Sequence, residues 1–197
     1  IIPVVFEKGS LGASGDLALL SHMSLPLIGL GEVYFEGQRM DAMLAFEKAK
    51  IKPLEKLHTK EGLSLINGTQ AMGAIGGLVL YDAIKLLDCA NLALAMTMEA
   101  LEGIVDAFHP LVHHIRRQDG QMMVAKEVLS YLKDSAYVTK QNEKRVQDAY
   151  SIRCAPQVHG ATRDALMHIR DIVEKEMNAV TDNPLIFVEE HMAISAG

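Results

Sequence analysis

TQAMGAIGGLVLYDAIKLLDCANLALAMTMEALEGIVDAF, residues 69–108, is a stretch in which almost every residue is compatible with a helix. No proline interrupts it before Pro110, and its apolar positions run nearly all round a helical axis. A helix that is apolar all round is normally buried among other elements. The stretch therefore predicts one long core helix over residues 69–108, packed in a helical bundle.

Shorter helical patterns lie on both sides of this stretch. Further helices are expected at residues 17–23, around 40–44, at 122–132 and at 161–180. Nothing alternates strands with helices, and no repeat, low-complexity tract or Gly/Ser linker divides the chain. The sequence therefore predicts a mostly α fold, a long-helix bundle core with functional loops. We expect residues 1–197 to form a single helical portion of a longer chain, without an internal domain boundary.

The composition excludes several classes of protein. The 197 residues are 49% hydrophobic and carry 19 basic against 25 acidic side chains, a net charge of −6. This length and hydrophobic content exclude a disordered chain and a disulfide-stapled miniature. The acidic balance provides no phosphate-binding field, so no nucleic-acid partner is expected. Cys89 and Cys154 are expected to be unpaired thiols in a reducing compartment, which favours the cytoplasm.

Residues 62–81 carry no charge over about the length that spans a bilayer. However, the stretch is rich in glycine and in hydroxyl and amide side chains, which hydrocarbon would leave poorly satisfied. No cluster of Lys or Arg lies at either flank. A buried helix is therefore expected here, not a membrane span.

A glycine-rich loop is expected at residues 9–16, GSLGASGD. It lacks the Lys-Ser/Thr of a phosphate loop and the GxGxxG of a dinucleotide loop, and a plain flexible turn is one interpretation. Another is chemical. If the Gly15 nitrogen attacked the Ala13 carbonyl and Ser14 lost its hydroxyl, the backbone would form a 4-methylidene-imidazol-5-one ring, an electrophile. Such a cyclisation needs small residues and a strained turn, which this loop permits.

Four motifs carry a resemblance to a known family. They are GSLGASGDL at 9–17, GLSLINGTQ at 62–70, QDAYSIRCAPQVHG at 147–160 and VTDNPLIF at 180–187. In this order they resemble the aromatic amino acid ammonia-lyases. The resemblance covers the whole chain but only a middle portion of the family's length, so we expect the chain to be part of a longer protein. Leu19 departs from the pattern, because the family usually has Pro there.

Within that family, the 147–160 motif resembles the histidine-specific branch. Phenylalanine-specific members more often carry Trp and Leu where Val158 and His159 stand. The resemblance implies a helical fold of the fumarase/aspartase type and a homotetramer whose active sites are each built from several subunits. It also implies elimination of ammonia from L-histidine to give urocanate, by way of an electrophile made from Ala13, Ser14 and Gly15.

The resemblance also implies roles for further residues. Arg153 is expected to bind the substrate carboxylate through its planar fork, with Gln147 and Tyr150 beside it in the active site. Asn67 is expected to hydrogen-bond both the electrophile and the reacting amino group. The family's β-proton base is a Tyr in a segment that precedes these motifs. Asp16 is expected either to hold the loop in its cyclising shape or to be a plain helix N-cap.

Structural alternatives remain open for each of these residues. Arg153 would suit a solvated surface, Tyr150 the rim of a core, and Asn67 the entry to a helix. Positions 147, 150 and 153 would share one face if the segment were helical.

His109, His113 and His114 invite a metal hypothesis, because histidines four residues apart on a helix can bind zinc. Pro110 weakens the helix that this spacing requires, and neither an HExxH motif nor a cysteine pair supports it. No metal is therefore expected.

Three functions remain in competition. The first is a histidine ammonia-lyase acting on its small amino acid substrate. The second is a tyrosine or phenylalanine ammonia-lyase or aminomutase of the same family. The third, from a different class, is a folded but inert helical oligomerisation core.

Overall fold

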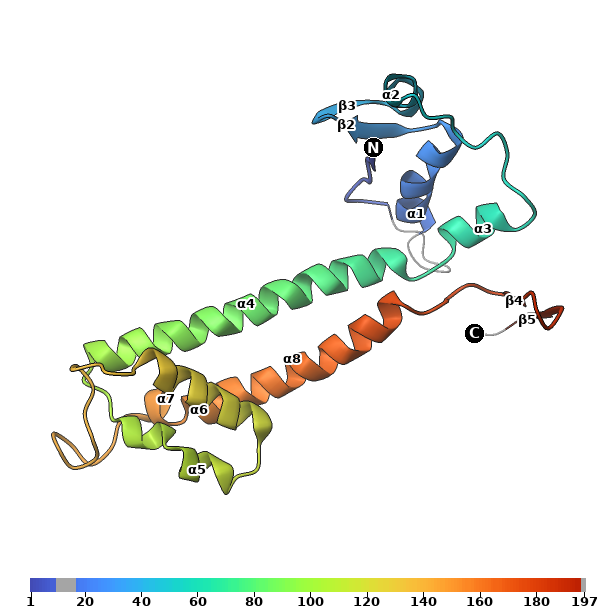
Figure 1. Ribbon diagram of the computed structural model, residues 1–197. Coiled ribbons are helices and arrows are strands. Elements are labelled where there is room, and N and C mark those ends of the chain that lie inside the picture. The colour runs from blue at the N-terminus through green and yellow to red at the C-terminus, as the bar shows by residue number, and fades with distance from the viewer. Residues whose placement is uncertain (10–16, 196–197) are drawn as a thin grey trace. The chain divides into compact units, whose positions relative to one another are not determined.

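The computed structural model describes residues 1–9 and 17–195 (Figure 1). The chain forms two compact units, Ile1–Ile75 with Glu176–Gly197, and Gly76–Lys175. Helices α4 (Gln70–Ala100) and α8 (Ala155–Met177) contribute residues to both units. The absence of an internal domain boundary stays a prediction.

The first unit combines two small antiparallel sheets with short helices. Its elements are β1 (Ile2–Pro3), α1 (Leu17–Ser24), the 3-10 helix η1 (Leu25–Ile28), β2 (Glu32–Phe35), β3 (Gln38–Asp41), α2 (Ala42–Ala49), α3 (Glu61–Ile66), β4 (Leu185–Phe187) and β5 (Met192–Ile194). One sheet has the order β1-β2-β3 and the other pairs β4 with β5. Glu36 and Gly37, at φ of 50° and 77°, make the two-residue turn between β2 and β3, as the twist of a tight hairpin requires. Fully buried Val33 of β2 packs against Ala42 and Ala45 of α2.

The second unit is helical. Besides its parts of α4 and α8 it contains η2 (Val105–Phe108), α5 (Pro110–His114), α6 (Asp119–Tyr131) and α7 (Tyr150–Arg153). Its core joins α4, η2, α6, α7 and the start of α8. The buried residues of this core are Leu94, Ala95, Met98, Phe108, Val124, Ala125, Val128, Leu132, Ile152 and Ala155. The mostly helical fold that the sequence predicts is thus present, and the helices expected at 17–23, 40–44 and 122–132 are α1, α2 and α6. Cys89 and Cys154 are free thiols, as expected.

The longest helix ends earlier than the prediction of residue 108. The chain leaves α4 after Ala100, because Glu102 adopts a left-handed φ of 51° and the Gly103 nitrogen donates to the Met98 carbonyl at 2.7 Å. This turn brings Phe108 back onto the core that α4 helps to form. Helix α8, predicted at 161–180, instead covers Ala155–Met177. Pro156 fits in its first turn, where a missing N–H leaves no hydrogen bond unmade.

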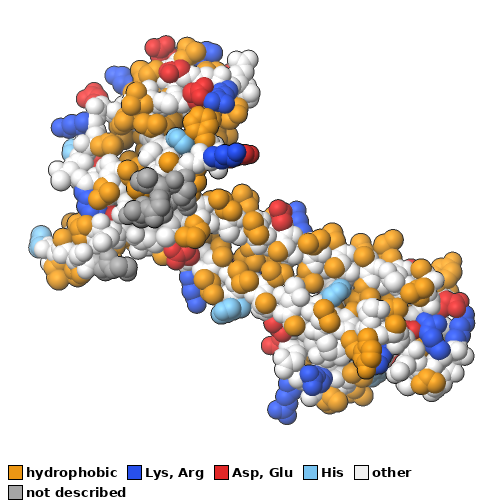
Figure 2. All heavy atoms as spheres, turned by 180° about the vertical axis from the view of Figure 1, so that it is seen from behind, with side chains coloured by type: hydrophobic (Ala, Val, Ile, Leu, Met, Phe, Trp, Pro, Cys, Tyr) orange, Lys and Arg blue, Asp and Glu red, His pale blue; other side chains and the backbone are white. Residues whose placement is uncertain are grey.

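The expectation that the long helix is buried all round is wrong within this chain. Only one side of α4 is buried, the side that carries Leu80, Leu87, Asn91, Leu94, Ala95 and Met98. Large apolar side chains stay exposed elsewhere on it, and Figure 2 shows hydrophobic side chains at the surface along the long helices. On α4 these are Met72, Ile75, Leu78, Val79, Tyr81, Leu86, Leu92 and Met96. Among the described residues, no helix has both the length and the apolar content needed to cross a membrane.

Close backbone packing joins α6 to α8. A Cβ built on Gly160 would overlap the Gln121 nitrogen and lie 2.8 Å from the Gly120 carbonyl carbon. Asp164 of α8 accepts a hydrogen bond from the Gly120 nitrogen at 2.8 Å, which satisfies a free N–H at the start of α6. The contact therefore requires glycine at position 160 on steric grounds.

A buried polar chain joins α4, α6 and α8. Asn91 is fully buried, and its amide nitrogen donates to Glu127 Oε2 at 3.1 Å. Its carbonyl oxygen therefore faces His159 Nδ1, 2.8 Å away, so that Nδ1 carries the proton. Because a buried amide is costly when unpaired, these bonds favour one arrangement of the three helices.

Replacing Gly160 by Ala separates helix propensity from packing. Propensity alone predicts a gain of about 1 kcal/mol for Ala over Gly inside a helix. Because the added methyl would meet backbone atoms of α6, we expect Gly160→Ala to lower the free energy of unfolding by about 1–3 kcal/mol. Urea unfolding measures the change.

Gly76→Ala on α4 is the matched control, because nothing lies within 4 Å of a Cβ at that position. It should stabilise the chain by up to about 1 kcal/mol. A stabilising Gly160→Ala would contradict the packing described here.

Candidate active site

The tripeptide expected to form the electrophile, Ala13-Ser14-Gly15, lies outside the described residues, and so does Asp16. The described chain stops at Gly9 and resumes at Leu17, the first residue of α1. The roles proposed for these residues stay predictions.

Asn67 lies between two helices of the first unit. It follows the last residue of α3, and its backbone nitrogen donates to the Leu63 carbonyl at 2.9 Å. It therefore ends α3, whereas the sequence alternative made it the entry to the next helix, which begins at Gln70. Its side chain is half-buried and has no hydrogen-bond partner among the described residues. The Asn67 amide is thus available for a ligand.

Gln147, Tyr150 and Arg153 lie together in the second unit. The carbon at the centre of the Arg153 guanidinium is 3.9 Å from the centroid of the Tyr150 ring, a cation–π contact. Gln147 and Arg153 line one small pocket of about 130 Å³. Only Tyr150 and Arg153 belong to α7, so the helical face expected for all three begins after Gln147.

One donor of the Arg153 side chain is unused. Its Nε is buried and has no hydrogen-bond partner in the described part of the chain. A buried N–H without a partner is costly, and a carboxylate is the acceptor that matches a guanidinium best. The arrangement therefore suits binding of a small carboxylate.

Neither unit alone contains all the predicted site residues. Asn67 belongs to the first unit, and Gln147, Tyr150 and Arg153 belong to the second.

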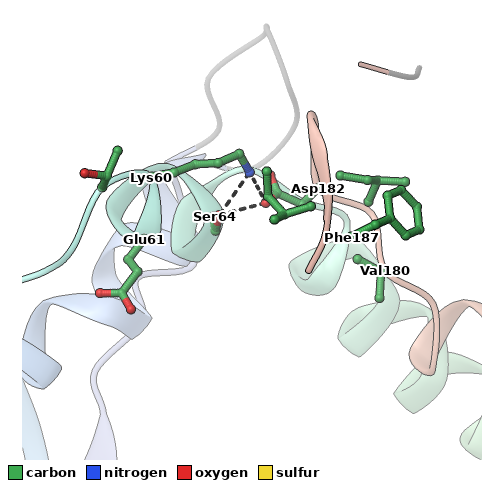
Figure 3. Close-up of a pocket in the computed structure, with 9 residues that line it drawn as sticks. Lys60, Glu61, Ser64, Val180, Asp182 and Phe187 are labelled. Carbon is green, nitrogen blue, oxygen red and sulfur yellow. Dashed lines mark hydrogen bonds and ion pairs between the residues drawn. The ribbon is translucent and has the colours of Figure 1, made fainter. Parts of the chain in front are cut away.

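A pocket of about 440 Å³ in the first unit lies at the start of α3 (Figure 3). Lys60 and Ser64 both point to Asp182, in the segment after α8, and Ser64 Oγ donates to it at 2.7 Å. Hydrogen bonds from Lys60 and then Ser64 hold the pKa of the Asp182 carboxyl below its ordinary value. Val180 and Phe187 add apolar surface to the same pocket. This cluster ties α3, which ends beside Asn67, to the VTDNPLIF segment.

Two acidic residues that line these pockets, Asp148 and Asp182, were not identified from the sequence. Asp148 is buried directly after exposed Gln147, and Asp182 is paired with a lysine far away in the chain. For Asp148 the only local signal was Arg145 three residues before it. For Asp182 no local signal existed.

Two of the three neighbouring histidines, His109 and His113, have structural contacts of their own. His113 is fully buried, with Nε2 3.0 Å from the Ala107 carbonyl and Nδ1 2.8 Å from the Gln121 amide nitrogen. The His109 ring accepts a hydrogen bond from the Leu111 nitrogen. Among the described residues, no three His, Cys, Asp or Glu side chains are grouped to hold a metal ion. Both ring nitrogens of His113 are used inside the core, which gives it a structural role.

The sequence profile of one family, described as aromatic amino acid lyase, matches residues 1–197. The chain belongs to the aromatic amino acid lyase family. The histidine ammonia-lyases of Clostridium tetani and Bacillus subtilis are each 53% identical to it over 195 residues, which is 99% of this chain and 38% of theirs. The chain thus spans well under half the length of these relatives.

Solved structures of the aromatic amino acid lyase family agree with the fold. Phenylalanine aminomutase from Pantoea agglomerans matches with a TM-score of 0.89 at 36% identity, over 99% of this chain and 40% of that one. Histidine ammonia-lyase from Trypanosoma cruzi matches with a TM-score of 0.82 at 35% identity, over 99% and 36%. The helical fold of the fumarase/aspartase type, implied by the sequence motifs, is confirmed.

The structural role of His113 predicts a pH dependence of stability. Burial lowers the pKa of His113 below its ordinary value, and the hydrogen bond to Ala107 offsets this only in part. The unfolded chain therefore takes up a proton near pH 6.5 that the folded chain binds only at lower pH. Stability should fall as the pH drops below about 6.5, by up to about 1.4 kcal/mol per pH unit.

Chemical unfolding between pH 7.5 and 5.5 measures this slope. We expect His113→Gln to reduce it, whereas the same change at exposed His114 should leave it unaltered. An unchanged slope in His113→Gln would show that His113 is protonated equally in both states.

Proposed function

We propose that the protein containing this chain is a histidine ammonia-lyase, which converts L-histidine to urocanate and ammonia. The observation that carries the proposal is the identity of 49–53% to histidine ammonia-lyases of several bacteria, over at least 99% of this chain. The proposed setting is histidine catabolism in the cytoplasm, where free Cys89 and Cys154 would stay reduced.

The electrophile of the reaction is proposed to be a 4-methylidene-imidazol-5-one ring made from Ala13, Ser14 and Gly15. Small side chains at these positions are compatible with backbone cyclisation. Two side chains could contribute hydrogen bonds to a ligand, because the Asn67 amide and the Arg153 Nε each lack a partner among the described residues. When formed, the ring makes the substrate nitrogen a better leaving group.

The side chains of this chain would bind and orient the substrate. Arg153 binds its carboxylate, with the guanidinium held against the Tyr150 ring and Gln147 beside it in the pocket. Asn67 donates or accepts a hydrogen bond at the amino group. Tyr150 is 72% exposed, so its hydroxyl is free to contact the reacting part of the substrate. Loss of a β-proton and cleavage of the C–N bond then give urocanate and ammonia.

A homotetramer is the proposed assembly. The exposed apolar side of α4 supports it, because monomeric proteins rarely expose so much contiguous apolar surface. Assembly would also allow Asn67 of one subunit and Arg153 of another to serve one active site.

The second candidate is a tyrosine or phenylalanine ammonia-lyase or aminomutase. Tyrosine aminomutase from Streptomyces globisporus favours it, matching with a TM-score of 0.88 at 33% identity. That identity is lower than the 53% to histidine ammonia-lyases, so we place it second. The inert helical core remains the candidate without activity.

Assaying the protein that contains this chain with L-histidine, L-tyrosine and L-phenylalanine separates these functions. We expect urocanate from histidine, and no cinnamate or coumarate. Product from tyrosine or phenylalanine alone would support the second candidate, and no product from any of them would support the inert core.

Arg153→Lys tests the carboxylate site, because it keeps the charge and removes the planar fork. We expect kcat/KM for histidine to fall about 10- to 100-fold, mainly through KM. Arg116→Lys, at an exposed position, is the control and should change nothing. An unaltered KM in Arg153→Lys would contradict the assignment.

A further inference from the structure

The segment that carries Gln147, Tyr150 and Arg153 is held by two inward side chains. Gln147 and Tyr150 are exposed, whereas Asp148 and Ile152 are only 7% and 8% exposed. Ile152 packs in the hydrophobic core. Asp148 is therefore the polar attachment of this segment to the unit.

Both oxygens of the Asp148 carboxylate accept hydrogen bonds. Its Oδ2 accepts a hydrogen bond from the Ile104 nitrogen at 2.6 Å, and its Oδ1 accepts one from Arg145 Nε at 2.6 Å. Its side chain is 2% exposed. A charge this deeply buried is tolerated only when it is paired and hydrogen-bonded.

Arg145 connects the same carboxylate to the end of α4. Its Nη2 donates to the carbonyls of Leu101 and Glu102, at 2.8 and 3.0 Å, directly after α4 ends. Helix C-terminal carbonyls lack partners within the helix and carry partial negative charge, so a guanidinium is well suited to them. Arg145 therefore fixes the segment against a rigid element.

Residues 101–104, which receive these bonds, are held in turn by hydrogen bonds to the backbone around Thr139. Ile104 lies beside Thr139, with the Val105 nitrogen donating to the Thr139 carbonyl at 3.0 Å and the Thr139 nitrogen to Gly103 at 2.8 Å. Both attachment points of Asp148 and Arg145 are thus held by backbone hydrogen bonds.

Asp148 also lines the pocket that contains Gln147 and Arg153. Its negative charge there would compete with a substrate carboxylate for Arg153 if nothing else neutralised it. Arg145 provides that neutralisation, and Arg153 Nε has no partner among the described residues.

We propose that Arg145 and Asp148 are a positioning pair for the substrate-carboxylate site. The pair fixes the segment that carries Gln147, Tyr150 and Arg153. Because Arg145 neutralises the Asp148 carboxylate, it also prevents that carboxylate from pairing with Arg153. This inference rests on the proposed function, because it assigns the pair to the carboxylate contact of an amino acid substrate.

The test compares kinetic constants in the whole protein that contains this chain. Asp148→Asn, which keeps an acceptor for Ile104, should raise KM for histidine about tenfold with a smaller change in kcat. Arg145→Gln should raise KM further, because it leaves Asp148 unpaired beside Arg153. The double variant should have a lower KM than Arg145→Gln, because it removes the unpaired charge beside Arg153, but a higher KM than Asp148→Asn, because it still lacks the Arg145 bonds to Leu101 and Glu102.

Lys144→Gln is the matched control. Lys144 forms an exposed ion pair of 2.5 Å with Glu102, on the same turn that Arg145 contacts, but does not touch Asp148. Its KM should equal that of the wild type. A purely structural role for the pair would lower the unfolding midpoint and the yield of active protein in both single variants while leaving KM unchanged, and that result would overturn the proposal.

The failure of the proposed function is a separate outcome. If the wild type and Lys144→Gln give no urocanate, the proposed function is wrong. KM is then measured with the amino acid that is turned over, because histidine, tyrosine and phenylalanine all carry the same carboxylate. Hydrogen exchange needs no substrate. The Ile104 amide and amides 150–153 should exchange faster in Asp148→Asn than in Lys144→Gln, and equal rates would overturn the positioning claim.

Discussion

The buried Asp148 carboxylate is the constraint on which the second unit depends. A charge in that position needs Arg145 and the Ile104 nitrogen as partners, and Arg145 in turn needs the free carbonyls beyond α4. Asp148 and Arg145 therefore satisfy their hydrogen bonds together. Their bonds connect the end of α4 and residues 101–104 to the segment that carries Tyr150 and Arg153. The proposed site for a substrate carboxylate is thus attached to rigid elements, although Gln147 and Tyr150 lie on an exposed segment.

The helices are likewise held by hydrogen bonds in addition to apolar burial. Apolar side chains such as Leu94 and Val128 supply the burial, but many arrangements of smooth apolar faces would bury similar area. The glycine at 160 and the buried amide of Asn91 favour one of them, because each fits only at close range or with fixed partners. The specific geometry of these helices therefore comes from a few polar and small residues.

Much of the fold was predictable because its signals are local. The helical pattern of residues 69–108 predicts α4, but not its end at Ala100, since the turn at Glu102 depends on Phe108 returning to the core. The exposed side of α4 was not predictable either, because an apolar pattern does not say whether the same chain or another covers it. Residues within one motif, Gln147 and Arg153, were found together in one pocket. By contrast, Asp148 bonds to a backbone nitrogen 44 residues away and Asp182 to a lysine 122 residues away, and single-sequence patterns carry no such pairing.

The central claim is that this chain carries both a backbone electrophile, made from Ala13-Ser14-Gly15, and a segment that binds a carboxylate. The most direct test is the mass of the peptide Gly9–Glu32, released by proteolysis from the protein purified in its active form. Cyclisation of Ala13-Ser14-Gly15 and dehydration of Ser14 predict a mass lower by two water molecules than the sequence gives. An unmodified peptide from protein that turns over histidine would contradict the account.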